Sequence, residues 1–314
     1  MDLLDDYLAG VRAHGAVFCS TVSAPPWGLR FTEPAPIALT AMLRGDGWLV
    51  PAEGDPVELP EGGVALIRTR QPYTVADHPD SRPRVHVDGA DRCTLTGDDP
   101  AEEGRNWRVT GRLVGESAGT GPDLLVTAGY RGGGDLCGPL LDALPPVAVV
   151  QAEPGLASLL ALIAAEVEHD EPGQQVVLDR FLDLLLVRAL RSWFARSDTA
   201  PPTGYRALSD PHIGHVLRRL HEDPARPWTV ASLANEAGMS RTAFARRFSA
   251  LVGRPPLTYL TEWRMTLAAD RLRTPGATVT RVAKDVGYGD GFAFSAAFKR
   301  VRGVSPTAYR ESAL

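Results

Sequence analysis

The chain contains one pattern twice, as VASLANEAGMSRTAFARRFSALVGRPP over Val230–Pro256 and as VTRVAKDVGYGDGFAFSAAFKRVRGVSP over Val279–Pro306. Each copy predicts two short helices, because a small Ala lets the helices approach and a Gly permits a left-handed turn between them. The shared positions are Ala234, Gly238, Phe244 and Phe248 in the first copy and Ala283, Gly287, Phe294 and Phe298 in the second. The two Phe of each copy lie four residues apart and mark a buried helix face. The pattern indicates a duplicated helix-turn-helix, a unit that presents one helix to a DNA groove.

Charge is divided unevenly along the chain. Residues 205–314 carry 17 Lys and Arg against 9 Asp and Glu, a net of +8. The remaining residues carry 16 basic and 29 acidic side chains, a net of −13, which together give the −5 of the whole chain. The positive charge predicts that residues 205–314 bind a polyanion, whereas the acidic remainder of the chain does not.

Length and composition narrow the class of protein. A chain of 314 residues predicts two or three compact units. The opening MDLLDDYLAG lacks the basic and apolar regions of a secretory signal, and the apolar run Leu156–Val167 is too short to span a bilayer. Cys19, Cys93 and Cys137 are too few for a disulfide framework and lack the spacing of a zinc site. We therefore expect a cytoplasmic protein.

The first 150 residues predict a small β-domain, because short β-rich segments alternate with turns such as RGDG and PEGG. His78–Arg105 is expected to form a long loop or hairpin. The expected strands are Ala16–Val22, Ile37–Leu43, Trp48–Pro51, Val64–Thr69, Trp107–Leu113 and Leu124–Ala128.

Two apolar helices are expected next, over Gly155–His169 and Gln174–Arg196. The apolar face predicted for the second is Val177, Phe181, Leu184, Leu185, Arg188 and Trp193. This hairpin could cover the β-domain or form a dimer seam, and the two roles are compatible. The predicted ranges are a sensor domain over 1–150, the hairpin over 151–197, a linker over 198–209 and a DNA-binding domain over 210–314. The fold class is α+β.

The second helix of the first copy carries the candidate DNA contacts. Ser240 is a good N-cap, and Phe244, Phe248 and Leu251 are expected to face inward. Arg241, Thr242 and Arg246 then lie on the outer face, where base edges would be met. Arg246 suits guanine O6 and N7. Arg247 is turned away from that face and is expected to meet phosphate or solvent.

The corresponding helix of the second copy has a different outer face. Phe292 and Ser295 are the expected base contacts there, with Ala293 and Ala296 beside them, while Lys299 and Arg300 suit phosphates. This face has few groups for hydrogen bonding to bases and can touch thymine methyls. We expect the first copy to specify sequence and the second mainly to add affinity. Pro255–Arg273 is predicted to be one rigid connecting helix.

The paired motifs, this connector and the closing GVSPTAYR resemble the AraC/XylS family of transcription regulators over about 100 residues. The resemblance implies seven helices, two of which read adjacent major grooves of double-stranded promoter DNA. It also implies control of transcription, usually as an activator acting with RNA polymerase. Many members carry polar residues where this chain has Phe292–Ala296.

The amino-terminal half resembles, more loosely, a cupin-type sensor domain through LRGDGWLV, LPEGGVALIRTRQPYTVADHP and LCGPLLDALPPV. Enzymatic cupins hold a metal through a GxHxH pattern, but Ala41–Tyr73 contains no His. We therefore expect no metal, no cofactor and no catalysis, and keep a metal-dependent cupin enzyme as the alternative. Aromatic side chains could line a small-molecule pocket or simply form core: Trp27, Phe31, Trp48, Tyr73 and Trp107. The effector itself is not indicated.

Cys19 and Cys137 raise the question of redox control. Their layout resembles the reactive-chlorine-responsive type of cupin-containing regulator, in which cysteines at matching segments sense oxidants. The alternative is that both are buried small hydrophobes. Neither has a Lys, Arg or His beside it in sequence to lower its thiol pKa, which favours the second interpretation.

Overall fold

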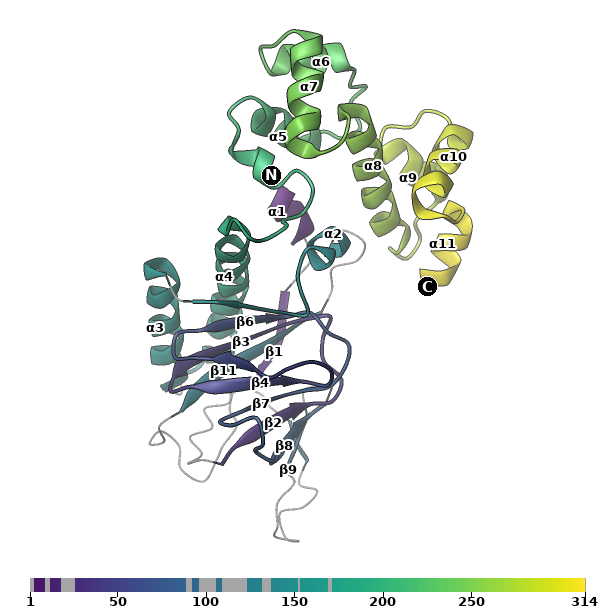
Figure 1. Ribbon diagram of the computed structural model, residues 1–314. Coiled ribbons are helices and arrows are strands. Elements are labelled where there is room, and N and C mark those ends of the chain that lie inside the picture. Colours follow the sequence, from purple (N-terminus) through teal and green to yellow (C-terminus); the bar gives the residue numbers. More distant parts are fainter. Residues whose placement is uncertain are drawn as a thin grey trace. The chain divides into compact units, whose positions relative to one another are not determined.

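The computed structural model describes residues 3–8, 12–17, 26–88, 92–95, 106–108, 123–131, 137–151, 153–168 and 171–313. Contacts divide the chain into two compact units. Unit 1 comprises Met1–Gly10, Gly133–Ala143 and Pro201–Leu314, and unit 2 comprises Val11–Gly132 and Leu144–Ala200. Unit 2 contains the strands and two helices, whereas the described part of unit 1 is helical (Figure 1).

Unit 2 is built on two sheets with a shared core. One sheet has the order β1-β11-β3-β6-β12 and the other β10-β9-β8-β2-β7-β4-β5, and the described pairs are antiparallel except β2 with β8. Side chains from both sheets, such as Phe31, Met42 and Val75, pack together between them. The strands are β1 (Arg12–Val17), β2 (Gly28–Phe31), β3 (Ile37–Arg44), β4 (Gly47–Pro51), β5 (Val57–Leu59), β6 (Val64–Ile67), β7 (Tyr73–Ala76), β8 (Val85–Val87), β9 (Arg92–Leu95), β10 (Asn106–Arg108), β11 (Leu124–Arg131) and β12 (Val147–Val150).

Each of the expected strands overlaps an observed one, but the sequence analysis missed half of the strands named above. The missed strands are β2, β5, β7, β8, β9 and β12, which have three or four residues each. Segments this short show little alternation and become strands only by pairing with distant neighbours. For residues 78–105 the sequence predicted either a long loop or a hairpin. Strands β8 and β9 of this segment pair antiparallel, with Val85 opposite Leu95, which agrees with the hairpin.

Helices α3 (Pro154–Glu168) and α4 (Gln174–Ala195) form the expected hairpin. Helix α4 packs on β1, β6 and β12 of the five-stranded sheet, and the Tyr130 hydroxyl donates a hydrogen bond to the Leu182 carbonyl at 2.7 Å. The predicted apolar face was partly wrong, because Val177 and Leu184 are 39% and 48% exposed. The face buried instead is Leu178, Leu182, Leu185, Leu186, Ala189, Leu190 and Phe194. Apolar residues lie around most of α4, so their spacing alone did not select the face.

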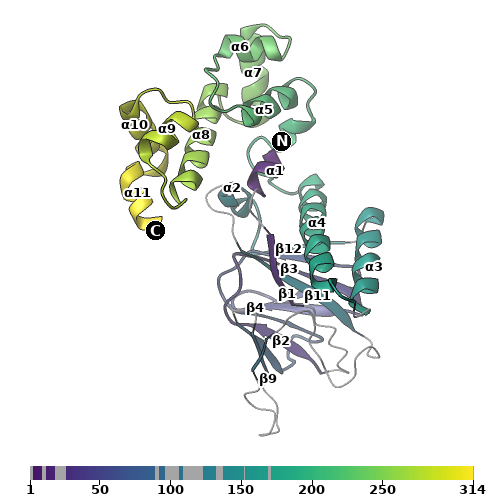
Figure 2. The same cartoon turned by 180° about the vertical axis from the view of Figure 1, so that it is seen from behind.

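Unit 1 has two separate cores joined by one helix (Figures 1 and 2). Helix α8 (Pro256–Leu272), the expected connector, places Tyr259 and Leu260 in the first core and Met265 to Leu272 in the second. The seven helices that the resemblance implied are all present within residues 210–313. They are α5 (Ile213–Glu222), α6 (Val230–Glu236), α7 (Arg241–Val252), α8, α9 (Val279–Asp285), α10 (Gly291–Arg302) and α11 (Pro306–Ala313).

Two short segments from the amino-terminal half also belong to unit 1. They are α1 (Leu3–Tyr7) and α2 (Gly138–Asp142), which lie next to β1 and β11 in the sequence. Contacts thus group the chain differently from the contiguous ranges expected from the sequence. The reason is that Leu4, Tyr7 and Leu140 are buried within unit 1.

Candidate nucleic-acid interface

The second helix of each motif, α7 in the first and α10 in the second, begins at a side-chain cap; these two helices are hereafter called the recognition helices for their expected role. Ser240 Oγ accepts a hydrogen bond from the Ala243 N–H at 3.3 Å, as the sequence predicted. Asp290 accepts bonds from the N–H groups of Phe292 and Ala293 at 3.0 and 3.2 Å. Caps of this kind satisfy backbone donors that the helix itself leaves free. Each helix therefore starts at a defined residue, which sets the side chains that face outward.

The turn before each recognition helix contains the predicted left-handed Gly. Gly238 has φ +64° and Gly287 has φ +85°. The surroundings of the two glycines differ. A Cβ at Gly238 would meet nothing within 4 Å, whereas a Cβ at Gly287 would lie 2.5 Å from the Ala225 carbonyl oxygen. Equivalent positions in the two motifs therefore face very different steric limits.

The outer face of α7 carries the residues predicted for base contact. Arg241, Thr242 and Arg246 are exposed, while Phe244 and Phe248 are fully buried. The inward placement of Leu251 was wrong, because Leu251 is 43% exposed. Val252 takes the buried place, since it lies four residues after Phe248 and so continues the row of Phe244 and Phe248 along the helix.

Arg247 has a partner that the sequence did not reveal. Its Nε and one terminal nitrogen lie 3.2 and 2.5 Å from Asp210 Oδ2. The other Asp210 oxygen accepts from the N–H groups of His212 and Ile213 and so caps the start of α5. The Arg247 hydrogen bond is the largest cause that lowers the pKa of Asp210. The phosphate contact expected of Arg247 stays a prediction. In that contact the guanidinium would bind a phosphate while it also binds the Asp210 carboxylate.

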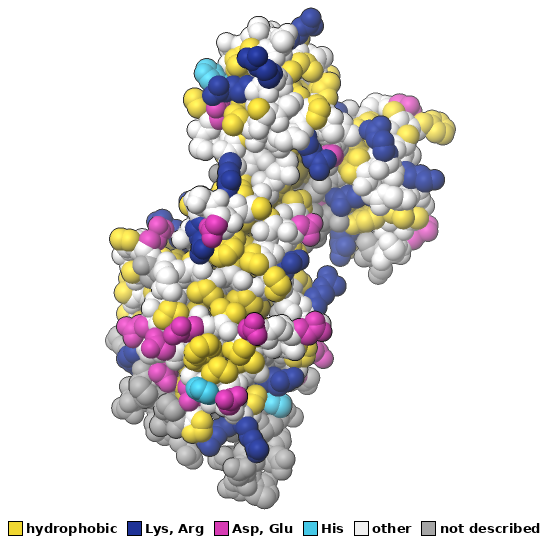
Figure 3. All heavy atoms as spheres, viewed as in Figure 1, with side chains coloured by type: hydrophobic (Ala, Val, Ile, Leu, Met, Phe, Trp, Pro, Cys, Tyr) yellow, Lys and Arg dark blue, Asp and Glu magenta, His cyan; other side chains and the backbone are white. Residues whose placement is uncertain are grey.

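The outer face of α10 is apolar at its start and basic at its end. Phe292 is 88% exposed, Ser295 is half-buried, and Lys299 and Arg300 are exposed. Phe294 and Phe298 are fully buried, as expected. Figure 3 shows Lys and Arg side chains projecting from the helical part of the chain, of which residues 205–314 carry a net charge of +8. The assignment of these α7 and α10 residues as DNA contacts stays a prediction.

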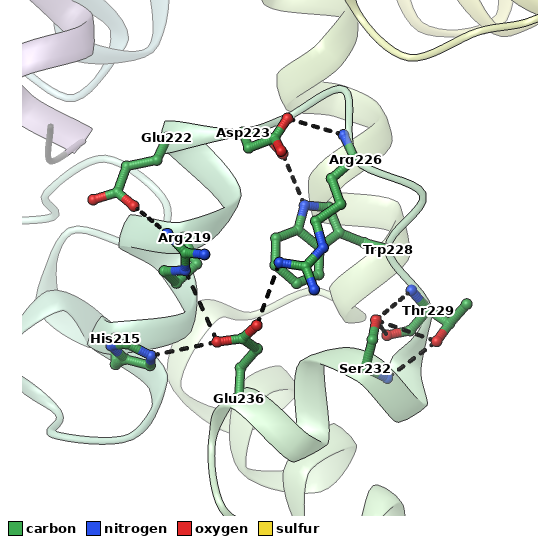
Figure 4. A network of polar contacts seen from close by, with 9 residues as sticks. All are labelled: His215, Arg219, Glu222, Asp223, Arg226, Trp228, Thr229, Ser232 and Glu236. Carbon is green, nitrogen blue, oxygen red and sulfur yellow. Dashed lines mark hydrogen bonds and ion pairs between the residues drawn. The ribbon is translucent and has the colours of Figure 1, made fainter.

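The loop between α5 and α6, residues 223–228 and hereafter the α5–α6 loop, is held by its own polar groups (Figure 4). The Trp228 indole N–H donates to the Asp223 carbonyl at 2.9 Å, and the Arg226 N–H donates to Asp223 Oδ1 at 3.1 Å. The Arg226 guanidinium lies 4.2 Å from the centre of the Trp228 ring. These contacts give the loop one defined shape.

Glu236 of α6 connects this loop to α5 (Figure 4). Its carboxylate lies 3.5 Å from Arg226 of the loop, 3.9 Å from Arg219 and 3.7 Å from His215. The Glu236 side chain is only a quarter exposed. One carboxylate therefore joins the loop, α5 and the first helix of the first motif.

Comparison with known proteins identifies both halves of the chain. The cupin family matches residues 2–195, and the helix-turn-helix domain family matches residues 233–312. A putative AraC-like transcription regulator of Streptomyces lividans is 35% identical over 99% of this chain and 98% of its own length. The chain belongs to the AraC-like transcription regulators. A second such regulator, from Streptomyces antibioticus, is 33% identical over 99% of both chains. The RCS-specific HTH-type transcriptional activator RclR of Escherichia coli (strain K12) is 32% identical over 50% of this chain and 55% of its own.

In this AraC-like regulator, α1 packs against α5 and α8 within unit 1. Asp6 Oδ2 lies 2.5 Å from His221 Nδ1, and the other His221 nitrogen lies 2.8 Å from the Tyr259 hydroxyl. The Tyr7 ring meets Trp263 edge-on at 6.1 Å. Tyr259 in turn contacts the Phe248 ring of α7 at 5.9 Å. A chain of contacts therefore runs from the amino-terminal segment to the first recognition helix.

Cys137 of the regulator is part of the same cluster. Its side chain is 1% exposed, and its thiol donates to the Tyr7 carbonyl at 2.7 Å. Burial, with a smaller effect of the Asp270 charge, raises the pKa of this thiol to about 12. The ionised, reactive form is therefore scarce at neutral pH. Cys19 lies outside the described residues, and Cys93 is described only as part of the β9 backbone.

Apolar side chains form the core between the two sheets of the regulator's cupin domain. Trp27, Phe31 and Tyr73 are buried in the core between the two sheets, whereas Trp48 is half-buried. The Trp107 side chain lies outside the described residues. Within the described part of the chain, no cluster of three or more His, Cys, Asp or Glu could hold a metal ion. A search of the same residues finds no helix with the length and apolar character to cross a membrane.

Proposed function

We propose that this AraC-like regulator binds double-stranded promoter DNA by placing α7 and α10 in the major groove. The observation that carries the proposal is the pair of capped helices that expose Arg241, Thr242 and Arg246 on α7 and Phe292 and Lys299 on α10, within residues 205–314 of net charge +8. In this reading Arg241, Thr242 and Arg246 contact bases, with Phe292 and Ser295 in a lesser role. Arg247, Lys299 and Arg300 contact phosphates. Full-length relatives that carry the name of transcription regulators support this function over a cupin enzyme.

The test has two steps. The full chain first selects duplexes from a random pool, and its affinity for a selected duplex is then measured as a function of salt concentration. Three phosphate contacts alone would make the affinity fall on the order of tenfold or more between 50 and 200 mM salt. A matched duplex of scrambled sequence should bind far more weakly at every salt concentration. Binding that neither depends on salt nor distinguishes the two duplexes would exclude the proposed function.

We propose further that the regulator acts as an activator that works with RNA polymerase and that its cupin domain controls it, through a small molecule or an oxidant. Support for control comes from α1 and α2, which are adjacent in sequence to the paired strands β1 and β11 and are buried in unit 1. A change in these strands would therefore act on segments that contact α5 and α8.

Between the two kinds of signal, the burial of Cys137 favours a small molecule. Brief treatment with hypochlorous acid should leave the Cys137 thiol intact and DNA binding unchanged, because the thiol is buried and its raised pKa keeps it in the less reactive protonated form. Intact mass and free-thiol counts, with unfolded protein as the control for full reactivity, measure this. A Cys19–Cys137 disulfide accompanied by altered DNA affinity would instead establish redox control.

We also propose a homodimer that forms through the exposed face of the α3–α4 hairpin. Leu162, Val176 and Leu184 are 55%, 62% and 48% exposed there, beyond the face that packs on the sheet. Leu184→Glu should yield monomers in sedimentation at micromolar concentration, because it places a charge in the middle of this exposed apolar face. A wild-type chain that sediments as a monomer would remove the dimer and leave the hairpin as a cover of the sheet.

A further inference from the structure

The two helix-turn-helix motifs are joined at a second place besides α8. The second place is the α5–α6 loop, which belongs to the first motif's core through Trp228. Three successive residues of this loop, Pro224 to Arg226, are contacted by α8 or by the turn of the second motif. The motifs are therefore connected by the helix and, independently, by packing.

Arg264 makes the polar part of this second connection. Its Nε donates to the Pro224 carbonyl at 2.7 Å, and a terminal nitrogen donates to the Arg226 carbonyl at 2.8 Å. Arg264 lies between Leu260, the last residue of α8 in the first core, and Met265, the first residue of α8 in the second. The planar guanidinium can hold two carbonyls in one fixed geometry, which a single ammonium cannot reproduce.

The second motif completes the connection with its turn. Gly287 packs so closely on Ala225 that a Cβ there would lie 2.5 Å from the Ala225 carbonyl oxygen and 2.8 Å from its Cα. The next residue, Tyr288, has its ring 5.8 Å from the Arg264 guanidinium and meets Phe294 of α10 edge-on at 5.7 Å. Contacts therefore lead from the loop through Arg264 and Tyr288 to the second recognition helix.

Polar contacts within the first motif hold the α5–α6 loop in place, so the loop resists displacement by the second motif. Its ends are held by the Trp228–Asp223 hydrogen bond, and Arg226 is held by Asp223 and Glu236 (Figure 4). A joint made by α8 alone could bend or twist at mid-helix, but a joint with two separate attachments resists both motions. The distance and rotation between α7 and α10 are thus fixed by the second attachment as well as by the helix.

We propose that Arg264, seated on the α5–α6 loop beside Gly287, is a positioning residue that sets which spacing of two half-sites the regulator accepts. The proposal rests on the proposed function, in which α7 and α10 occupy consecutive major-groove segments. One added base pair moves the second half-site by about 3.4 Å and rotates it by about 35°, which a rigid pair of helices cannot follow.

The experiment compares three duplexes that share the selected half-sites and differ by −1, 0 and +1 base pair between them. For the full wild-type chain we expect about tenfold weaker binding to the −1 and +1 duplexes, because Phe292 and Ser295 of α10 then meet the wrong base pairs, and one mismatched base pair costs about tenfold in affinity. For Arg264→Met we expect weaker binding to the native duplex and a spacing penalty within about threefold, since the freed motifs can adjust.

Two further variants separate positioning from charge and from folding. Arg273→Met removes one positive charge from the exposed end of α8 and should keep the wild-type spacing penalty. Arg264→Lys keeps the charge but lacks the guanidinium fork, so it should relax the spacing even if the Met variant does not fold, as judged by thermal unfolding. A folded Arg264 variant with the wild-type spacing penalty would overturn the proposal, as would a wild-type chain that tolerates all three spacings. If the wild-type chain selected no sequence, the proposed function would fail and the spacing rule with it.

Discussion

Gly287→Ala should destabilise unit 1 by about 2–5 kcal/mol, whereas Gly238→Ala at the equivalent turn of the first motif should cost only about 1–2 kcal/mol. Both glycines have positive φ, so Ala carries a similar backbone cost at either position. Only at Gly287 does the added Cβ meet backbone atoms, with the Ala225 oxygen at 2.5 Å and its carbonyl carbon at 3.0 Å. Backbone atoms cannot rotate away as a flexible side chain could, so the second motif must shift from the loop.

Denaturant unfolding of the full chain, followed by hydrogen exchange of the backbone amides in the unit 1 helices α9 and α10, measures this difference. The two variants are matched controls for one another, because each makes the same substitution in the same turn. DNA affinity should fall more for Gly287→Ala even at temperatures where it stays folded, since the displaced loop also contacts Arg264. Equal losses of stability at the two glycines would contradict the tight packing of Gly287 on Ala225.

Arg246→Ala should weaken binding to the selected duplex by about 1–3 kcal/mol and relax the preference at a single base pair. Arg246 is exposed on the outer face of α7, and within the described residues no carboxylate forms an ion pair with it. The guanidinium is thus available for the O6 and N7 atoms of guanine. Competition binding against duplexes with each base at each position reports the change.

Arg247→Ala is the matched control, since it removes the neighbouring guanidinium from the same helix. Arg247 is proposed to contact a phosphate, and phosphate contacts carry no sequence information, so its loss should weaken all duplexes about equally and leave the base preference intact. Ala296→Gln on α10 should likewise disturb the preference less than Arg246→Ala. The assignment of unequal roles to the two helices would be refuted if changes on α7 and α10 relaxed discrimination to the same extent.

The features that the sequence predicted well depend on neighbours within one or two helical turns. Ser240 caps α7 through a residue three positions on, and Phe244 and Phe248 share a face because they lie four apart. The length of α8 is set by a Pro at its start and by a continuous run without Gly. Caps, periodicity and turn glycines act locally, so the paired motifs and the burial of their Phe side chains could be derived from the residues alone.

The sequence by itself thus determined a duplicated helix-turn-helix, the burial of Phe244, Phe248, Phe294 and Phe298, and a β-rich amino-terminal half. Only the tertiary structure decided which residues far apart in the sequence meet. Arg247 binds Asp210, 37 positions away, and Asp6 meets His221 across 215 positions. The face that α4 buries and the pairing of three-residue strands were decided in the same way. Such contacts arise when distant segments pack, and their energy depends on geometry that no local pattern encodes. For this reason Gly238 and Gly287 occupy equivalent positions in the sequence pattern, but only at Gly287 would an added Cβ collide with the backbone of another segment.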